Sequence, residues 1–574
     1  MAEKFSDTDK TFCSILLDVI SAKGVADVVC SPGSRNTPLV IASAVRKNLR
    51  KHVVADERCA AFMALGMALV SQKPVALICT SGTALLNYAP AVAEAFYQGV
   101  PLIVLSADRP QQWIDQDDSQ TLRQFEALSN FVKKSYEIPA WGDSDPELQW
   151  YANRIANDAM IEACSRRPGP VHINVRLAEP LGRKLERMAE SPRVIDILSA
   201  DTVANKEVIK GLAEEVARSK VMLVAGFLPP DSRLHKSVAE FCSLPNVTAM
   251  TETLSNLHID DNATSIDSVL TWLPSEKLDT HAPDLVISLG GSLVSRKLKE
   301  YLRVNKGRCR HWSLGLSHTT SDCFMSLSKR IELEPSRFLH HLASAVAKVQ
   351  KNSGENEAAG YSSNWRILRE KALAAKDVFI SSAPWSELKA FSILSDKLPR
   401  EANLFLSNGT SVRYAQIVNG RRPHASYCNR GVSGIDGCTS TAVGGACAYK
   451  GMTVFVTGDL SMAYDIGALA LREAPDRMKI VVIDNQGGGI FRFIPTTSEL
   501  DEREEYFCAS PILPLRHLAE GYGWEYYEAS CEASLRSGLD SLFSSSAKGI
   551  IRVVCDGEKS ASLLRQYMQI KSEI

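Results

Sequence analysis

The chain has 574 residues and a formal net charge of −1, with 65 basic and 66 acidic side chains. This balance argues against a protein that binds nucleic acid or an anionic membrane surface. Hydrophobic residues make up 45% and charged residues 23%, so a packed globular core is expected, and a prior of ~150 residues per domain predicts about three to four domains.

Membrane and secretion signals are weak along the chain. Its apolar stretches are broken by Gly, Pro or charge well before the ~18 residues of a membrane span. Residues 1–10 are polar and mixed in charge, unlike a signal peptide. The fourteen cysteines are scattered and none forms a C-x-x-C pair, which favours reduced thiols in a cytoplasmic protein.

The first region begins with a pattern typical of α/β proteins. A helix is expected over 8–22, closed by Gly24, and a strand over 26–30. The strand runs into Ser34-Arg35 and a helix that starts near Pro38, which suits a first turn. Such a corner binds anions through free N–H groups and the helix dipole, and Arg35 adds a fork suited to a carboxylate or phosphate. The alternative is an ordinary turn with a solvated arginine.

Glu57 follows the short predicted strand 52–55 and precedes a long apolar helix over 60–70. An acid in a first helical turn suits the helix dipole, so Glu57 could be a simple stabilising charge. It also lies at the carboxyl end of a strand, where α/β proteins bind ligands. The rest of this domain, which should end near residue 183, is predicted as strands 74–79, 101–106 and 171–175, a helix over 84–97, and a polar loop or lid over 113–120.

A charged linker over 182–192 leads into a second βα region. Its strands are predicted at 221–225, 247–250, 285–289 and 310–314. No G-x-G-x-x-G follows any of these strands, so a dinucleotide-binding role is weakly supported. Arg296 and Lys297 follow a glycine-rich strand end and could bind an acidic ligand or form a solvated helix start.

A second linker over 351–357 opens the third region. Its elements are predicted as a helix over 364–375, a strand over 403–407, a glycine-rich stretch over 429–437 and a helix of small residues over 440–449. The predicted domain boundaries are therefore 1–183, 184–355 and 356–574, and the fold class is α/β with mostly parallel sheets in three doubly wound domains.

The most informative stretch is 457–491. An apolar run over 453–456 ends at Gly458-Asp459, and a second run over 480–483 ends at Asp484-Asn485. A helical pattern lies between them, with one apolar face formed by Ile466, Leu469, Ala470 and Leu471. Strands this apolar belong to a covered parallel sheet, so Asp459 and Asn485 should both lie at its carboxyl edge.

An acid and an amide at that edge offer oxygen ligands. Mg²⁺ takes one or two such ligands together with waters and phosphates, and three glycines over 487–489 would let a backbone carbonyl turn inward. A metal that holds a diphosphate is one interpretation. The other is a tight turn in which Asp459 is an ordinary helix cap.

The spacing resembles a known motif. Asn485 follows Asp459 by 26 positions, as in the metal–diphosphate motif of thiamine diphosphate enzymes. The sequence departs from the commonest form of that motif at Leu460, where Gly is usual, and at Asp484, where Asn is usual.

Further stretches occur in order along the chain: S-P-G-S-R-N-T-P-L, A-D-E-R-C-A-A-F, T-S-G-T-A, S-A-D-R-P and N-R-G-V-S-G-I-D-G. Together with the stretch above, they resemble the 2-succinyl-5-enolpyruvyl-6-hydroxy-3-cyclohexene-1-carboxylate synthases, thiamine diphosphate enzymes of menaquinone biosynthesis. The resemblance implies a pyrimidine-binding domain, a central Rossmann-like domain and a diphosphate-binding domain. It also implies a homodimer or homotetramer, with active sites between the first domain of one subunit and the third of another.

The implied reaction is decarboxylation of 2-oxoglutarate and 1,4-addition of the resulting carbanion equivalent to isochorismate. The resemblance assigns Glu57 to the cofactor's pyrimidine ring, where a carboxylate can share a proton with a ring nitrogen. It assigns Arg413 and Arg430 to the oxo-acid and the first adduct. These three residues form the implied catalytic set.

The resemblance also implies binding residues. The metal, Mg²⁺ or Mn²⁺, would be held by Asp459, Asn485 and the carbonyl of Gly487. Other cofactor contacts are Gly409, Ile435, Asp436, Gly458, Leu460 and Ser461, with Ile435 as the apolar support of the bent cofactor. The remaining substrate contacts are Ser34, Arg35, Arg109, Gln120, Arg296, Lys297, Ile490 and Phe491. Both substrates are dianions, which explains the need for several cations.

Two departures from the family pattern concern the substrate and cofactor contacts. Gly409 stands where relatives often have Ser, and whether Thr410 or Ser411 supplies the missing hydroxyl is open. Arg296-Lys297 keeps the charge of the usual pair but not its order. His172 and His424 are expected to be structural.

Two other functions compete with this synthase. Another thiamine-dependent 2-oxo acid decarboxylase or carboligase would keep Glu57, Asp459 and Asn485. It should not need Arg35, Arg109 or the Arg296-Lys297 pair. A non-enzymatic scaffold would have lost the first three, and all three are present.

Overall fold

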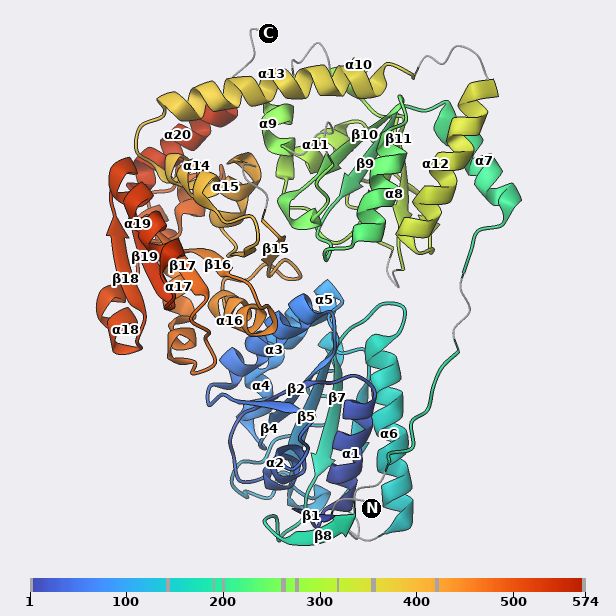
Figure 1. Ribbon diagram of the computed structural model, residues 1–574, viewed down its shortest axis with the longest axis vertical. Helices are drawn as coiled ribbons and strands as arrows, with labels where there is room; N and C mark the ends of the chain where they lie inside the picture. The colour runs from blue at the N-terminus through green and yellow to red at the C-terminus, as the bar shows by residue number, and fades with distance from the viewer. Residues whose placement is uncertain are drawn as a thin grey trace. The chain divides into compact units, whose positions relative to one another are not determined.

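The computed structural model describes residues 4–140, 145–188, 191–198, 202–259, 265–273, 278–316, 320–352, 358–418 and 423–569 (Figure 1). The chain divides into two compact units. Unit 1 comprises Met1–Ser199, Asn429–Thr453 and Tyr464–Met478, and unit 2 comprises Ala200–Cys428, Val454–Ala463 and Lys479–Ile574. Each unit is described by itself.

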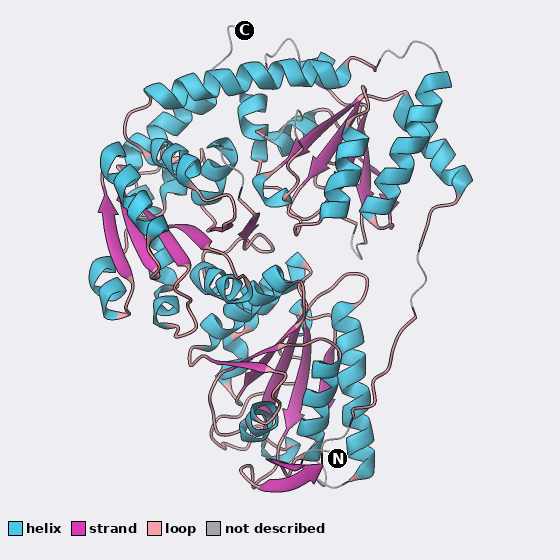
Figure 2. Ribbon diagram, viewed as in Figure 1, coloured by secondary structure: helices cyan, strands magenta, loops and turns pink. Residues whose placement is uncertain are grey.

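Unit 1 is built on a six-stranded sheet whose strands all run parallel. Its spatial order is β3 (Arg50–Val53), β2 (Asp27–Cys30), β4 (Val75–Cys79), β5 (Leu102–Asp108), β7 (Val171–Arg176) and β6 (Ser135–Ile138). Helices cover both faces (Figure 2), as the apolar strands require. One layer contains α1 (Thr11–Ala22), α2 (Thr37–Ala44) and α6 (Pro146–Cys164), and the other contains α3 (Glu57–Ser71) and α5 (Ala89–Gln98).

Two predictions in this region are corrected. The expected helix over 84–97 is two helices, α4 (Thr83–Asn87) and α5, because Pro90 near the start of α5 lacks the N–H that a continuous helix needs. Part of the expected linker over 182–192 is a strand, β8 (Lys184–Met188), which pairs antiparallel with β1 (Lys4–Thr8).

Unit 2 contains a five-stranded parallel sheet. Its order is β10 (Val247–Thr251), β9 (Val221–Ala225), β11 (Leu285–Leu289), β12 (Arg310–Leu314) and β13 (Leu327–Ile331). The four predicted strands are confirmed, and β13 was missed. One face packs on α7 (Lys206–Ala217), α8 (Ser232–Cys242) and α12 (Pro335–Asn352), and the other on α9 (Ile266–Thr271), α11 (Arg296–Val304) and α13 (Tyr361–Ser382).

The second sheet of unit 2 has six strands. Its order is β15 (Ala425–Cys428), β14 (Asn403–Leu406), β16 (Thr453–Gly458), β17 (Met478–Asp484), β19 (Gly549–Val554) and β18 (Glu525–Ala529). Its helices include α14 (Glu387–Lys397), α15 (Ser411–Val418), α18 (Leu515–Gly521), α19 (Glu532–Ser544) and α20 (Gly557–Gln569). The α/β fold class with mostly parallel sheets is thus confirmed. The domain boundaries stay predictions, and residues 353–357 of the second expected linker lie outside the described residues.

The helix expected between β16 and β17 is the clearest misprediction. It is split into α17 (Asp459–Tyr464) and a 3-10 turn (Ile466–Ala470), and Ala470 is exposed instead of sharing the buried face of Leu469. Asp465 lies at the break with a buried carboxylate that accepts hydrogen bonds from Ser440 N and Oγ, at 2.7 and 3.0 Å. These bonds hold Asp465 outside a helical conformation.

Within the described part of the chain, no helix combines the length and the apolar character needed to span a bilayer. All fourteen cysteines are free thiols.

Candidate active site

The predicted metal ligands lie at one edge of the second sheet of unit 2. Asp459 directly follows β16 and Asn485 directly follows β17, and these two strands are neighbours. The two loops meet, because the Gly487 N–H donates a 2.7 Å hydrogen bond to Asp459 Oδ2. The expected placement of Asp459 and Asn485 at a shared sheet edge is therefore confirmed.

Two oxygens at this edge have no hydrogen-bond donor among the described residues. They are Asp459 Oδ1 and Asn485 Oδ1, and both are buried. A buried polar atom left unpaired costs about 1–3 kcal/mol, so a ligand that satisfies both atoms is favoured. A carboxylate and an amide oxygen fit a hard cation such as Mg²⁺ or Mn²⁺.

The described residues contain no cluster of three or more His, Cys, Asp or Glu side chains that could hold a metal. Burial, followed by the charge of Asp484, raises the pKa of Asp459 to about 7, and N–H donors from Gly487 and Leu460 oppose the rise. A nearby cation would favour the charged carboxylate.

Gly487 is required by its conformation and by its surroundings. Its φ of +120° lies in the left-handed region, and a Cβ there would come within 2.4 Å of the Cys508 carbonyl oxygen. Its own carbonyl accepts the Gly489 N–H at 2.9 Å. A carbonyl oxygen has a second lone pair, so this bond is compatible with the predicted metal contact.

Glu387 was missed in the sequence. Its side chain is buried at the first turn of α14, where Oε1 accepts from Asn485 Nδ2 at 2.8 Å and Oε2 accepts from Thr410 Oγ1 at 3.1 Å. Burial raises the pKa of Glu387, and the donors from Asn485 and Thr410 oppose the rise. Nothing in the Ser-Glu start of a helix distinguishes such a residue from an ordinary first-turn acid.

The hydroxyls near Gly409 are both engaged. Thr410 donates to Glu387 as above, and Ser411 Oγ lies 3.4 Å from Ser407 Oγ. Gly409 itself has a φ of +96°, which favours glycine.

Asp484, where Asn is usual in the family motif, has a structural partner. Its Oδ2 accepts from Arg552 Nε at 2.7 Å, and Arg552 lies on the neighbouring strand β19. An arginine beside this position requires an acid, and an asparagine could not supply the opposite charge.

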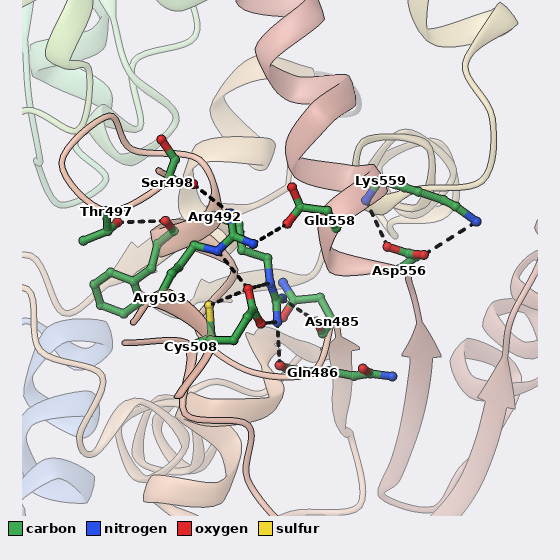
Figure 3. Close-up of polar contacts among 12 residues, drawn as sticks. Asn485, Gln486, Arg492, Thr497, Ser498, Arg503, Cys508, Asp556, Glu558 and Lys559 are labelled. Atoms are coloured by element: carbon green, nitrogen blue, oxygen red, sulfur yellow. Dashed lines mark hydrogen bonds and ion pairs between the residues drawn. The ribbon is translucent and has the colours of Figure 1, made fainter. Parts of the chain in front are cut away.

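Arg492 holds the backbone of the loop that follows β17 (Figure 3). Arg492 donates to the carbonyl oxygens of Asn485 and Gln486 at 2.8 and 3.0 Å, and it forms a 2.7 Å ion pair with Glu504. The bond to Arg492 lowers the pKa of Glu504 to about 2. Arg492, like Glu387, was missed in the sequence.

The remaining residues of this edge lie where the chain order placed them. Gly458 ends β16, Leu460 and Ser461 lie in α17, and Ile490 and Phe491 lie in a 3-10 turn. Ser461 is buried, and Ile490 and Phe491 are half-buried. The Phe491 ring lies 5.8 Å from that of Phe507, centroid to centroid.

Two predicted substrate cations of unit 2 interact with one buried carboxylate. Burial raises the pKa of Asp267, whereas Ser295, Lys297 and Arg413 lower it. Lys297 Nζ also donates to Thr271 Oγ1 at 2.6 Å. Arg413 lies in the first turn of α15 and donates to the Gly409 carbonyl. The charges of Lys297 and Arg413 therefore act on the same buried carboxylate, that of Asp267.

Arg296 does not share these partners. Its Nε donates to Glu300 Oε1 at 2.6 Å, and both side chains are largely exposed. Arg296 and Lys297 therefore have different partners in the structure. A substrate role for Arg296 stays a prediction.

Glu57 is the first residue of α3 in unit 1. The capping role belongs to Asp56, whose Oδ1 accepts the Cys59 N–H at 3.0 Å. Glu57 is half-buried, and its Oε2 lies 3.5 Å from Asn87 Nδ2. Its carboxylate is therefore not needed as the cap of α3.

Helix α3 packs closely against α16 (Cys438–Ala448) within unit 1. Glycines allow this approach, because a Cβ on Gly66 would lie 1.9 Å from Thr441 O and one on Gly444 would lie 1.9 Å from Met63 O. The Phe62 ring also fills the space beside Gly437. Ile435 and Asp436 directly precede Gly437. They therefore lie near α3, the helix that begins at Glu57.

Glu94 holds the loop that carries Arg430. This α5 carboxylate is buried, and it accepts the backbone N–H groups of Gly431 and Val432. Burial raises the pKa of Glu94, and these donors oppose the rise. No local pattern in the sequence indicates this contact.

The remaining substrate candidates follow β2 and β5 of unit 1. Arg35 is buried and donates to Leu177 O at 3.1 Å, while Arg109 forms a 2.7 Å ion pair with Asp118. Burial, followed by the charge of Arg109, lowers the pKa of Arg35. Ser34 and Gln120 are exposed. Arg35 also forms a 3.1 Å ion pair with Glu179, so each arginine has an acidic partner, and the two arginines lie close enough for their charges to repel.

His172 is structural, as expected. It is fully buried, its Nε2 lies 2.7 Å from Ser106 Oγ, and burial lowers its pKa to about 4. No role in the candidate site follows from this position.

Known proteins similar to this chain cover nearly all of it. Residues 10–127 match the family described as thiamine pyrophosphate enzyme, N-terminal TPP binding domain. The chain is 39% identical over 567 residues to a 2-succinyl-5-enolpyruvyl-6-hydroxy-3-cyclohexene-1-carboxylate synthase of Porphyromonas gingivalis, covering 98% of this chain and 97% of the relative.

Two further synthases of the same name are similar. That of Flavobacterium johnsoniae is 36% identical over 558 residues, covering 96% of this chain and 98% of the relative. That of Cytophaga hutchinsonii is 37% identical over 558 residues, with 96% and 97% covered. The role of each candidate residue stays a proposal.

Proposed function

We infer the activity of this chain from the premise that it belongs to the family of 2-succinyl-5-enolpyruvyl-6-hydroxy-3-cyclohexene-1-carboxylate synthases. It is a thiamine diphosphate-dependent enzyme of menaquinone biosynthesis that couples a decarboxylation to a carboligation. The reaction decarboxylates 2-oxoglutarate, adds the succinyl-semialdehyde carbanion equivalent to isochorismate in a 1,4-addition, and releases CO₂.

One structural observation carries the cofactor assignment, namely the two buried acceptor oxygens of Asp459 and Asn485. Bound thiamine diphosphate supplies the electron sink for decarboxylation. Asp459, Asn485 and the Gly487 carbonyl would hold a divalent cation, Mg²⁺ or Mn²⁺, against its diphosphate. The other cofactor contacts proposed are Gly409, Ile435, Asp436, Gly458, Leu460 and Ser461.

Glu57 is proposed to exchange a proton with a ring nitrogen of the cofactor's pyrimidine. This role is supported by the start of α3. Asp56 caps the helix there, so the Glu57 carboxylate is not needed for capping. A carboxylate in a partly closed site can hold or release that proton. Ile435 is proposed as the apolar support of the cofactor.

Substrate binding is proposed to depend on arginine and lysine, because both substrates carry two carboxylates. Arg413 and Arg430 would hold the oxo-acid. Isochorismate would be held by Ser34, Arg35, Arg109, Gln120, Arg296 and Lys297, with Ile490 and Phe491 as apolar neighbours. A homodimer or homotetramer and a cytoplasmic location also stay proposals.

The test is CO₂ release from 2-oxoglutarate, measured with thiamine diphosphate and Mg²⁺ in the presence and absence of isochorismate. We expect release that accelerates with isochorismate and a coupled cyclohexene product. Release indifferent to isochorismate would favour another thiamine-dependent decarboxylase, and no release from any 2-oxo acid would reject the proposal.

A further inference from the structure

We propose that Glu387 is a positioning residue that orients the Asn485 amide so that its oxygen faces the cation. This inference rests on the proposed function, since it assumes that Asn485 is a metal ligand. Glu387 itself would not touch the metal, the cofactor or a substrate.

The orientation follows from hydrogen-bond chemistry. The two ends of an asparagine amide have nearly the same shape, so their partners decide which end points where. An ionised carboxylate accepts hydrogen bonds and cannot donate them. Glu387 Oε1, 2.8 Å away, therefore selects the NH₂ end of Asn485. The Asn485 oxygen must point away from Glu387, and this is the buried oxygen that has no donor among the described residues.

Glu387 is itself fixed in position. Its side chain is only 2% exposed, its Oε2 accepts from Thr410, and its backbone N–H donates to Ser560 Oγ at 3.1 Å. Ser386 caps the helix that Glu387 begins, through a hydrogen bond from the Lys389 N–H. The carboxylate therefore has little freedom to follow a rotated amide.

Asn485 is constrained from two further sides. Its backbone carbonyl accepts from Arg492, which Figure 3 shows reaching across the loop. A Cβ on Gly489 would lie 2.3 Å from Asn485 Nδ2, so the amide lies tightly against this glycine. Backbone, amide nitrogen and packing together leave only the oxygen available to a ligand.

A purely structural role for Glu387 makes a different prediction. If Glu387 only satisfied buried donors, removing its carboxylate would lower the stability of the folded protein without changing metal affinity. If it orients Asn485, metal affinity must fall in protein that is still folded. Outer partners of metal ligands typically contribute 10–100-fold to affinity.

The experiment measures Mn²⁺ binding to the full chain with saturating thiamine diphosphate, by electron paramagnetic resonance of free Mn²⁺. Glu387→Met keeps the length of the side chain but removes the acceptor, and we expect about 10–100-fold weaker binding. Glu387→Gln can present either an acceptor or a donor, and we expect an intermediate loss of about fivefold or more, because the amide is no longer forced into one orientation.

Two controls sharpen the result. Thr410→Val removes the other hydrogen bond to Glu387 and leaves that of Asn485, so its loss should be smaller than that of Glu387→Met. Glu525→Gln changes an exposed acid of β18, outside the site, and should bind Mn²⁺ as the parent chain does. Thermal unfolding of each metal-free variant shows which proteins are folded.

The outcomes separate the two levels of inference. If the parent chain binds Mn²⁺ and both Glu387 variants bind it within twofold, the positioning role is wrong while the proposed metal site stands. If Glu387→Met does not fold, Glu387→Gln decides the matter by the same criterion. A parent chain that binds no Mn²⁺ would overturn both.

Discussion

Glu57 lies in the first turn of α3 while its neighbour Asp56 serves as the helix cap. We therefore expect Glu57→Gln to leave the helix and cofactor binding intact and to lower kcat by about 10²–10⁴, the usual contribution of a general acid–base. Steady-state turnover and a titration of thiamine diphosphate measure the two effects separately. Near-normal turnover would contradict the assigned role.

Glu94 is expected to act on the substrate only through the loop that carries Arg430. It accepts two backbone N–H groups from the loop of Arg430, and hydrogen bonds to a charged acceptor are worth about 1.5–3 kcal/mol each. Glu94→Gln should therefore lower kcat/KM for 2-oxoglutarate by about tenfold, chiefly through KM. Kinetics at varied 2-oxoglutarate measure this, and a variant that is less stable but has unchanged kinetics would show that Glu94 is only structural.

At the scale of elements, the contact between α3 and α16 depends on two glycines. A Cβ on Gly66 would lie 1.9 Å from Thr441 O, so Gly66→Ala must push the helices apart and should destabilise the protein by about 1–3 kcal/mol. Urea unfolding measures the change. Activity should fall as well, because α3 begins with Glu57 and α16 begins shortly after Ile435.

A matched control exists in α7. A Cβ on Gly211 would meet no atom within 4 Å, so Gly211→Ala should stabilise the protein by about 0.5–1 kcal/mol through helix propensity. If Gly66→Ala and Gly211→Ala changed stability in the same direction, the close approach of α3 and α16 would not control the packing.

The sequence predicted those elements whose signal is local. The apolar strands β16 and β17 locate Asp459 and Asn485 at one edge because parallel strands end together. The break at Asp465 was missed because it depends on Ser440, which lies 25 positions earlier. Local periodicity contains no information about such a partner.

The same limit explains which site residues were missed. Glu387 contacts Asn485 across 98 positions and Glu94 contacts Gly431 across 337. Each looks like an ordinary helical acid in the sequence. The candidate ligands could be inferred from motifs at strand ends, whereas the residues that hold them could be found only after the chain had folded.

At the scale of the whole molecule, the two units carry different substrate candidates. Unit 1 contains Arg35 and Arg109, and unit 2 contains Arg413 and Lys297. The proposed division assigns Arg109 to isochorismate and Arg413 to 2-oxoglutarate. These two arginines therefore offer a direct test of the roles assigned to them.

Arg109→Ala should weaken use of isochorismate more than it weakens decarboxylation of 2-oxoglutarate, and Arg413→Ala should do the reverse. A lost bidentate contact to a carboxylate should lower kcat/KM for the affected substrate by at least about tenfold, since bonds between charged groups are worth about 1.5–3 kcal/mol. Parallel assays of CO₂ release and of coupled product separate the two effects, because decarboxylation can proceed before isochorismate reacts. Because coupled product forms only after decarboxylation, Arg413→Ala should lower both rates, whereas Arg109→Ala should lower chiefly the formation of coupled product. If Arg109→Ala lowered both rates by the same factor, the proposed division of roles between Arg109 and Arg413 would be wrong.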